Sequence, residues 1–142
     1  MTGDWWEREA DAASSARRKE RRRWRDKFRE AIRGVKLGVR GHSSFFVHFF
    51  FAALALAAAL ALQCGLVEWC LVLGCIGLVL TAELLNSAIE TLFHSIDAES
   101  KQRNRGTLDI AAGAVLVASL TAALVGLLVF GRRVLILLRV WE

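Results

Sequence analysis

Two carboxylates and an amide recur at helical spacing within a long apolar part of the chain. Glu83, Asn86 and Glu90 stand at positions i, i+3 and i+7, so an α-helix places them on one face across two turns. Asp97, seven residues beyond Glu90, extends the same stripe. Ionised carboxylates at a membrane edge usually face the protein interior and have a partner there. The spacing therefore predicts a polar site on one helix face, although a helix leaving the bilayer would also present these side chains to water.

The partner of these carboxylates is not another residue of the same segment. No Lys or Arg lies between Leu54 and Lys101, so the apolar runs supply no basic side chain to pair with them. A divalent cation is the expected partner, because Mg²⁺ typically takes one or two carboxylates together with substrate phosphates.

Membrane-spanning helices must position this stripe. The chain has 142 residues, 55% of them hydrophobic, which is above the range of ordinary globular domains. The apolar residues form runs long enough to cross a hydrocarbon core of about 30 Å. We therefore predict an all-α integral membrane protein with three transmembrane helices, preceded by a basic amphipathic surface helix. The predicted parts are a polar basic extension at 1–22, a membrane domain at 23–131 with spans at about 43–62, 69–93 and 108–130, and an amphipathic tail at 132–142.

Basic residues predict the orientation. Thirteen of the nineteen Lys and Arg residues precede Ser43, and three more lie in the polar segment 98–106. By the positive-inside rule both segments face the cytoplasm, including the N-terminus. Arg132, Arg133 and Arg139 then fall on the opposite side, which disagrees with the rule but is outweighed by the larger set.

The basic head carries an apolar stripe at helical spacing. Trp24, Phe28, Ile32 and Val35 recur among its arginines, as in a helix that lies on anionic lipid headgroups. Anchoring is the simplest role for this helix; contact of some arginines with a phosphorylated ligand is the alternative. No nucleic-acid partner is expected so close to a membrane span.

The acidic stripe also resembles a family signature. Its eight residues, Glu-Leu-Leu-Asn-Ser-Ala-Ile-Glu, are similar to the pattern E-x-x-N-[ST]-A-[IL]-E of the prokaryotic diacylglycerol kinase family, which includes undecaprenol kinases. The resemblance extends over roughly residues 23–130. Its other matches are Phe28, Ala31 and Gly34 in an F-x-x-A-x-x-G segment, and residues 109–115 in the D-x-A-[AS]-[AG]-A-V that opens the third span.

This resemblance implies a homotrimeric lipid kinase of the bacterial cytoplasmic membrane. Such an enzyme transfers the γ-phosphoryl group of ATP to a membrane lipid alcohol, diacylglycerol or undecaprenol. Glu83 would be the catalytic base and Asn86 would support the site. Glu90 would bind Mg²⁺ on the nucleotide phosphates, and Asp109 would contact the nucleotide. Phosphoryl transfer needs mainly positioning and charge neutralisation, which these residue types can supply.

Several positions depart from the family's pattern. The segment E-x-N-x-R-x-[HE] at the start of the first span is represented by His42, Ser44, Phe46 and His48, of which only the last agrees. His94 replaces an Asp and Leu108 replaces a Lys that would touch phosphate.

Other residues are candidates to compensate for these losses. His42 is the candidate second metal ligand, and imidazole would favour Mn²⁺ or Zn²⁺ over Mg²⁺. Arg105 and Arg23 are the candidates for the missing positive charge at the nucleotide.

Three functions from different classes remain open. A working lipid kinase is favoured because the base and one metal ligand are intact. The alternative is a catalytically impaired relative that binds lipid or nucleotide in the membrane without turnover. Intramembrane carboxylates alone would also fit a small transporter or channel subunit.

Overall fold

The computed structural model describes residues 24–41 and 44–138 of the chain. These residues are almost entirely helical and include no β-strand. The helices, in chain order, are α2 (Trp24–Gly41), α3 (Ser44–Ala61), α4 (Leu66–Ser95), α5 (Ala98–Arg103) and α6 (Arg105–Leu137). Three of them, α3, α4 and α6, are long and apolar enough to cross a membrane. The predicted all-α architecture with three spanning helices is thus confirmed.

Two of the spanning helices, α4 and α6, are longer than the apolar runs alone suggest. α4 begins at Leu66 and α6 extends from Arg105 to Leu137, because the polar residues at their ends continue the helices beyond the hydrocarbon core. Residues 132–137 of the expected tail are a direct continuation of α6. The polar loop expected at 98–106 contains the short helix α5, whose N-cap Asp97 accepts a hydrogen bond from the Ser100 backbone N–H at 2.9 Å.

Helix α2 belongs, as far as Leu37, to a separate compact unit of the chain. Its apolar side chains Trp24, Phe28 and Ile32 are exposed and repeat every four residues, so they share one face. The ammonium group of Lys27 lies 5.3 Å from the centre of the Trp24 ring, a cation–π distance. The helix therefore has the two-faced character predicted from the sequence.

A tight turn joins α3 to α4 as an antiparallel hairpin. Gln63 adopts a positive φ of 51°, and the backbone N–H groups of Gln63 and Cys64 donate to the carbonyls of Leu60 and Ala59. This pair of bonds closes the end of α3 in the manner of a Schellman motif. The turn fixes the register, so that the first residues of α3 lie beside the middle of α4.

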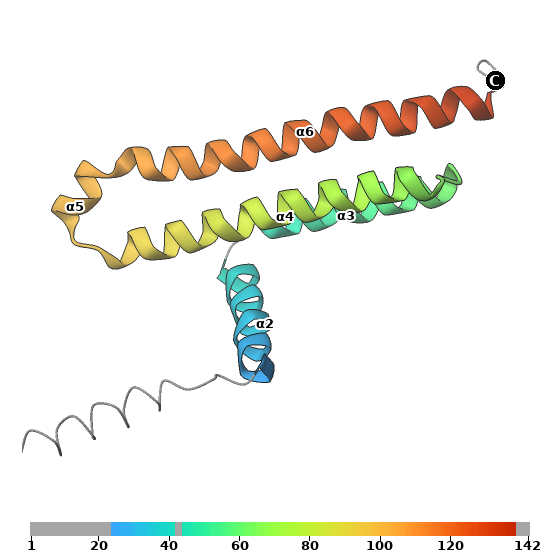
Figure 1. Ribbon diagram of the computed structural model, residues 1–142. Coiled ribbons are helices and arrows are strands. Elements are labelled where there is room, and N and C mark those ends of the chain that lie inside the picture. Colours follow the sequence, from blue (N-terminus) through green and yellow to red (C-terminus); the bar gives the residue numbers. More distant parts are fainter. Residues whose placement is uncertain (1–23, 42–43, 139–142) are drawn as a thin grey trace, which may run out of the picture. The chain divides into compact units, whose positions relative to one another are not determined.

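Helices α4 and α6 run antiparallel and make the most extensive contact in the bundle (Figure 1). Near the start of α4, Glu68 accepts from Arg133 Nε at 2.6 Å, from Arg132 Nη1 at 3.0 Å, and from the Gly65 backbone N–H at 2.6 Å. These bonds connect the hairpin turn to the end of α6. They also give two of the three basic residues on the predicted outer side an acidic partner.

The end of the bundle at α5, called the inner end after the predicted orientation, is formed by α4 and α6 without α3. α4 and α6, joined through α5, extend beyond the first residue of α3 (Figure 1). Ser44 contacts Glu83, and α4 continues for twelve further residues to Ser95, about 18 Å at the usual rise per residue. The two long helices thus form an extension that α3 does not cover.

Candidate functional site

Glu83 is a buried carboxylate held between two helices. It has only 2% of its surface exposed, and both of its oxygens face the first turns of α3. The Ser44 hydroxyl donates to Glu83 Oε1, and His48 Nε2 lies 3.6 Å from Glu83 Oε2. A buried carboxylate needs such partners, because leaving it unpaired in an apolar environment is strongly unfavourable. The hairpin register supplies them from residues four apart on one face of α3.

Asn86 and Glu90 lie one and two turns further along α4. The Asn86 side-chain N–H donates to Glu90 Oε1 at 3.3 Å, whereas Asn86 Oδ1 is buried and has no hydrogen-bond partner among the described residues. Glu90 is half-buried. This contact is consistent with the prediction from spacing that Asn86 and Glu90 share a helix face.

The acidic side chains lie at different depths. Glu68 marks the outer end of the α4–α6 pair, and Glu83 lies fifteen residues along the helix, about 22 Å away. Glu90 is about 10 Å further still, beyond the reach of a hydrocarbon core of about 30 Å that starts at Glu68. An apolar layer of this thickness that began at Glu68 would therefore end between Glu83 and Glu90.

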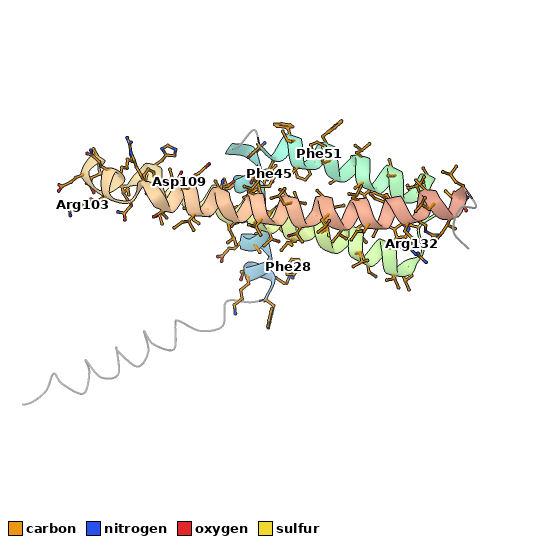
Figure 2. All side chains as sticks on the ribbon, turned by 90° about the horizontal axis from the view of Figure 1, so that it is seen from above. Phe28, Phe45, Phe51, Arg103, Asp109 and Arg132 are labelled. Atoms are coloured by element: carbon orange, nitrogen blue, oxygen red, sulfur yellow. The ribbon has the colours of Figure 1, made fainter. Side chains whose placement is uncertain are left out.

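Asp109 and Arg105 lie on the extension beyond α3. Asp109 is exposed on the stretch of α6 that passes the end of α3 (Figure 2). Asp109 lies 23 residues before Arg132 in α6, and position 91 lies 23 residues after Glu68 in α4. Because the two helices are antiparallel and Glu68 contacts Arg132, Asp109 lies at the level of position 91, next to Glu90. Arg105 is exposed one turn before Asp109. The two are thus placed at the inner end with Glu90, although no contact joins them.

Two predicted site residues, His42 and Arg23, lie outside the described part of the chain. Of the four other positions that differ from the family's pattern, Ser44 contacts the Glu83 carboxylate, and the remaining three are placed away from it. Phe46 is 77% exposed, His94 is exposed near the end of α4, and Leu108 is half-buried in the first turn of α6.

A long apolar groove leads to the buried carboxylate. It has a volume of about 730 Å³ and is lined by α3, α4 and α6. Its walls are almost entirely aliphatic and aromatic, from Gly131 and Ala58 at the outer end to Leu80 at the inner end. His48 and Ser119 are the polar side chains at the inner end of this lining. The groove is thus suited to an apolar chain whose polar end lies near Glu83.

Sequence reasoning did not identify Ser44 and Ser119 as site residues. Ser44 appeared only as a departure from the family's pattern, and Ser119 only as one of many small residues in the third span. Ser119 Oγ is buried without a hydrogen-bond partner among the described residues. By contrast, the hydroxyls of Thr81 and Thr121 donate to carbonyls of their own helices. A serine deep in an apolar span was the available signal, but the sequence does not show which serines lack a partner.

The residues at the inner end fit a hard divalent cation. Glu90 and the unpartnered Asn86 Oδ1 supply oxygen atoms, which Mg²⁺ prefers. The described residues contain no group of three or more His, Cys, Asp and Glu side chains that would enclose a metal. A site of this kind would hold the ion only together with substrate phosphates.

Two comparisons with known proteins find relatives of this chain. The family model of prokaryotic diacylglycerol kinase matches residues 29–130. The chain is also 31% identical over 120 residues to an undecaprenol kinase of Bacillus subtilis (strain 168), a match that covers 82% of this chain and 95% of that protein. No solved structure matches the chain. The residues matched by the family model contain the acidic stripe and nearly all of the groove and of the three spanning helices, and the chain belongs to the prokaryotic diacylglycerol kinase family.

Proposed function

We propose that this protein is a lipid kinase that transfers the γ-phosphoryl group of ATP to the hydroxyl of a membrane lipid alcohol, diacylglycerol or undecaprenol. The observation that carries the proposal is the buried Glu83, held by Ser44 and His48 at the inner end of an apolar groove. Family membership gives the class of reaction. The burial of Glu83 close to the groove supports a meeting of a lipid hydroxyl and a water-soluble nucleotide near this residue.

The two substrates approach from different phases. The lipid's apolar chain lies along the groove between α3, α4 and α6, so its hydroxyl is held near the Glu83 and His48 pair. The nucleotide binds at the uncovered inner extension, where Asp109 and Arg105 are exposed. Holding the hydroxyl and the phosphate in line supplies much of the rate enhancement in phosphoryl transfer.

Glu90 and Asn86 would hold the metal ion on the nucleotide phosphates. Bound Mg²⁺ neutralises the charge that develops on the transferred group. Arg105, together with Arg23 from the basic head, is proposed to contact the phosphates. His42 is the proposed additional metal ligand; its imidazole would broaden the metal preference toward Mn²⁺ or Zn²⁺.

The same proposal includes the setting of the enzyme. We expect a homotrimer in the bacterial cytoplasmic membrane, with its N-terminus in the cytoplasm and with α2 lying on anionic headgroups. The exposed apolar face of α2 and its surrounding arginines support the membrane-surface role.

The test is a phosphoryl-transfer assay on the purified full-length protein in detergent micelles. Diacylglycerol and undecaprenol are supplied in turn, with ATP and with Mg²⁺, Mn²⁺ or Zn²⁺, and phosphorylated lipid is measured. We expect turnover with at least one alcohol and a loss of at least about 100-fold in Glu83→Gln. Glu99→Gln, an exposed α5 carboxylate paired with Arg103 at 2.5 Å, is the control and keeps full activity. An inactive protein under all of these conditions would support the non-enzymatic alternative.

A further inference from the structure

We propose that Arg132 and Arg133 form a binding site for an anionic phospholipid and hold the phosphate of its headgroup. The site lies at the end of the bundle beside the α3–α4 turn, called the outer end after the predicted orientation. It is at the opposite end of α4 and α6 from α5, and it does not depend on the proposed kinase function. The lipid it fits has a phosphodiester that carries a neutral polyol, as in phosphatidylglycerol.

The first argument is the charge of the arginine cluster. Arg132 and Arg133 donate to the same carboxylate, that of Glu68, at 3.0 and 2.6 Å. One carboxylate balances only one of the two guanidinium groups, so the cluster keeps a positive charge. Among the described residues, neither arginine has a second acidic partner. At the end of a spanning helix, the anion that the membrane itself supplies is the lipid phosphate.

The second argument is the set of donors that Glu68 leaves unused. A guanidinium has five N–H groups, and Glu68 takes one nitrogen of each arginine, Nη1 of Arg132 and Nε of Arg133. The remaining nitrogens donate to no group within residues 24–41 and 44–138. Arginine binds phosphate through paired N–H···O bonds. Because Glu68 already holds both side chains in place, less side-chain entropy is lost when a phosphate binds.

Gly65 gives the guanidinium of Arg133 its place over the turn. A Cβ atom at Gly65 would stand only 3.4 Å from Arg133 Nη2. The missing side chain therefore lets this nitrogen approach the backbone of the turn and leaves the space beside it open.

The third argument is the cavity next to the arginines. It has a volume of about 410 Å³, and its walls combine Arg132 and Arg133 with Leu66, Val67 and Ile136. Leu66 and Val67 are 81% and 72% exposed. Exposed aliphatic side chains beside charged ones suit the boundary between headgroups and acyl chains. A lipid would place its phosphate on the arginines and its first methylenes on this aliphatic wall, whereas inorganic phosphate would leave the wall uncovered.

The state of Glu68 selects the kind of headgroup. Its Oε1 accepts from Arg132, and its Oε2 accepts from Arg133 and from the Gly65 backbone N–H at 2.6 Å. A cationic amine on a zwitterionic headgroup would therefore meet an occupied carboxylate and the remaining positive charge of the arginines. A headgroup without an amine avoids this repulsion.

The experiment measures lipid binding to the full-length protein by native mass spectrometry from a nonionic detergent. Phosphatidylglycerol and phosphatidylcholine with identical acyl chains are added in turn, and Kd is obtained from the populations of lipid adducts. We expect the wild type to bind phosphatidylglycerol about fivefold more tightly, the effect of roughly one charge at a membrane surface. Millimolar inorganic phosphate, added as a competitor, is expected to leave the lipid bound.

Two single variants form the matched pair. Arg132→Gln is expected to weaken phosphatidylglycerol binding about tenfold, the effect of a charged hydrogen bond, and to leave phosphatidylcholine binding unchanged. It keeps the bonds of Glu68 to Arg133 and Gly65, so its unfolding temperature without lipid should match the wild type. Arg103→Gln is the control, because Arg103 is similarly exposed and also pairs with a glutamate, but lies in α5. Its lipid affinities should equal those of the wild type.

Arg132→Lys separates geometry from charge. It keeps the positive charge beside Glu68 but loses the paired donors, so its affinity for phosphatidylglycerol should lie between those of the wild type and Arg132→Gln. Wild-type affinity in Arg132→Gln, or an equal loss in Arg103→Gln, would show that net charge alone attracts the lipid and would overturn the proposal. Displacement of the lipid by inorganic phosphate would overturn its assignment to a phospholipid.

Discussion

At the scale of single residues, polar atoms inside the spans fall into two groups. The hydroxyls of Thr91 and Thr121 donate to carbonyls of their own helices, at 2.8 and 2.9 Å, and so have a hydrogen-bond acceptor without a contact to another helix. Ser44 instead reaches across to another helix, and Ser119 reaches no described partner. A hydroxyl without a partner, such as that of Ser119, is unfavourable in an apolar medium. The two serines mark places where a neighbouring charge or a ligand completes the hydrogen bonding.

Glu90 is predicted to act through the metal–nucleotide complex. Its carboxylate accepts from Asn86 at the inner end of the bundle, where a magnesium ion would bridge it to phosphate. Glu90→Gln is expected to lower kcat/KM for ATP about 100-fold, the size found for other groups that stabilise transition-state charge. Activity should recover partly as free Mg²⁺ is raised.

The measurement is a titration of initial rate against Mg²⁺ at fixed ATP. Glu99→Gln again serves as the control. A Glu90→Gln enzyme with the wild-type dependence on Mg²⁺ would remove Glu90 from the metal site.

The sequence predicted the acidic stripe but not its contacts. Glu83, Asn86 and Glu90 share a face because helical periodicity is local, so spacing alone was sufficient. The pairing of Glu83 with Ser44 joins residues 39 apart and depends on the register of a hairpin. A shift of one residue would turn α3 by about 100° and direct Ser44 elsewhere. No local pattern contains that information.

At the scale of elements, α4 has two functions along its length. Its first part packs against α3 and α6 in the apolar layer, whereas the last twelve residues extend with α6 past α3. Its ends were harder to predict than its existence. The second span was predicted to begin at about 69, yet Leu66 to Glu68 form the first turn of α4, where Glu68 finds three hydrogen-bond donors.

The turn between α3 and α4 should tolerate a more flexible residue. Gln63 has a φ of 51°, a conformation that favours glycine because a side chain there is crowded by the backbone. Gln63→Gly is expected to stabilise the protein by about 1 kcal/mol. Gln63→Ala keeps the strain and should give no gain. Unfolding in mixed micelles of increasing denaturing-detergent fraction measures both variants. Equal stability for the two would show that the turn is not strained.

Asp97 should make the start of α5 sensitive to acid. The Ser100 backbone N–H bond to its carboxylate lowers the pKa of Asp97. Because the folded pKa is lower than the unfolded one, this stabilisation is complete above the ordinary value and is lost as pH falls below about 4.

Asp97→Asn is the matched variant, since Asn also caps helices but does not titrate. Hydrogen exchange of the α5 amides, corrected for intrinsic rates, is expected to rise in acid for the wild type and to stay constant for Asp97→Asn. The same acid response in both proteins would exclude Asp97 as its cause.

At the scale of the whole molecule, the orientation in the membrane stays a prediction that rests on the distribution of basic residues. The polar α5 segment lies at one end of the α4–α6 pair, and the Glu68–Arg132–Arg133 contacts lie at the other (Figure 1). Positive charge on the outer side is less unfavourable when it is paired with a carboxylate. The three apolar runs predicted the number of spans. They could not predict that Arg132 and Arg133 would share one acidic partner, because that partner is 64 residues away.

Cysteine labelling can test this orientation. Cys64 lies in the hairpin turn, and Ser100 lies in α5 at the opposite end. With Cys70 and Cys75 replaced by serine, a membrane-impermeant maleimide is expected to label Cys64 from outside intact cells. In a background that also lacks Cys64, Ser100→Cys should react only after permeabilisation. The reverse pattern would invert the topology and place the nucleotide site outside the cell.

The contact between Ser44 and Glu83 also has a consequence for biogenesis. The ribosome completes α3 before α4, so the hydroxyl and imidazole that receive Glu83 are already present when that carboxylate enters the translocon. Insertion of the second span can therefore proceed as a hairpin with its acidic group shielded, before α6 has been synthesised. The chain order of the helices gives the membrane-embedded acid its protection at the moment when exposure to lipid would be most unfavourable.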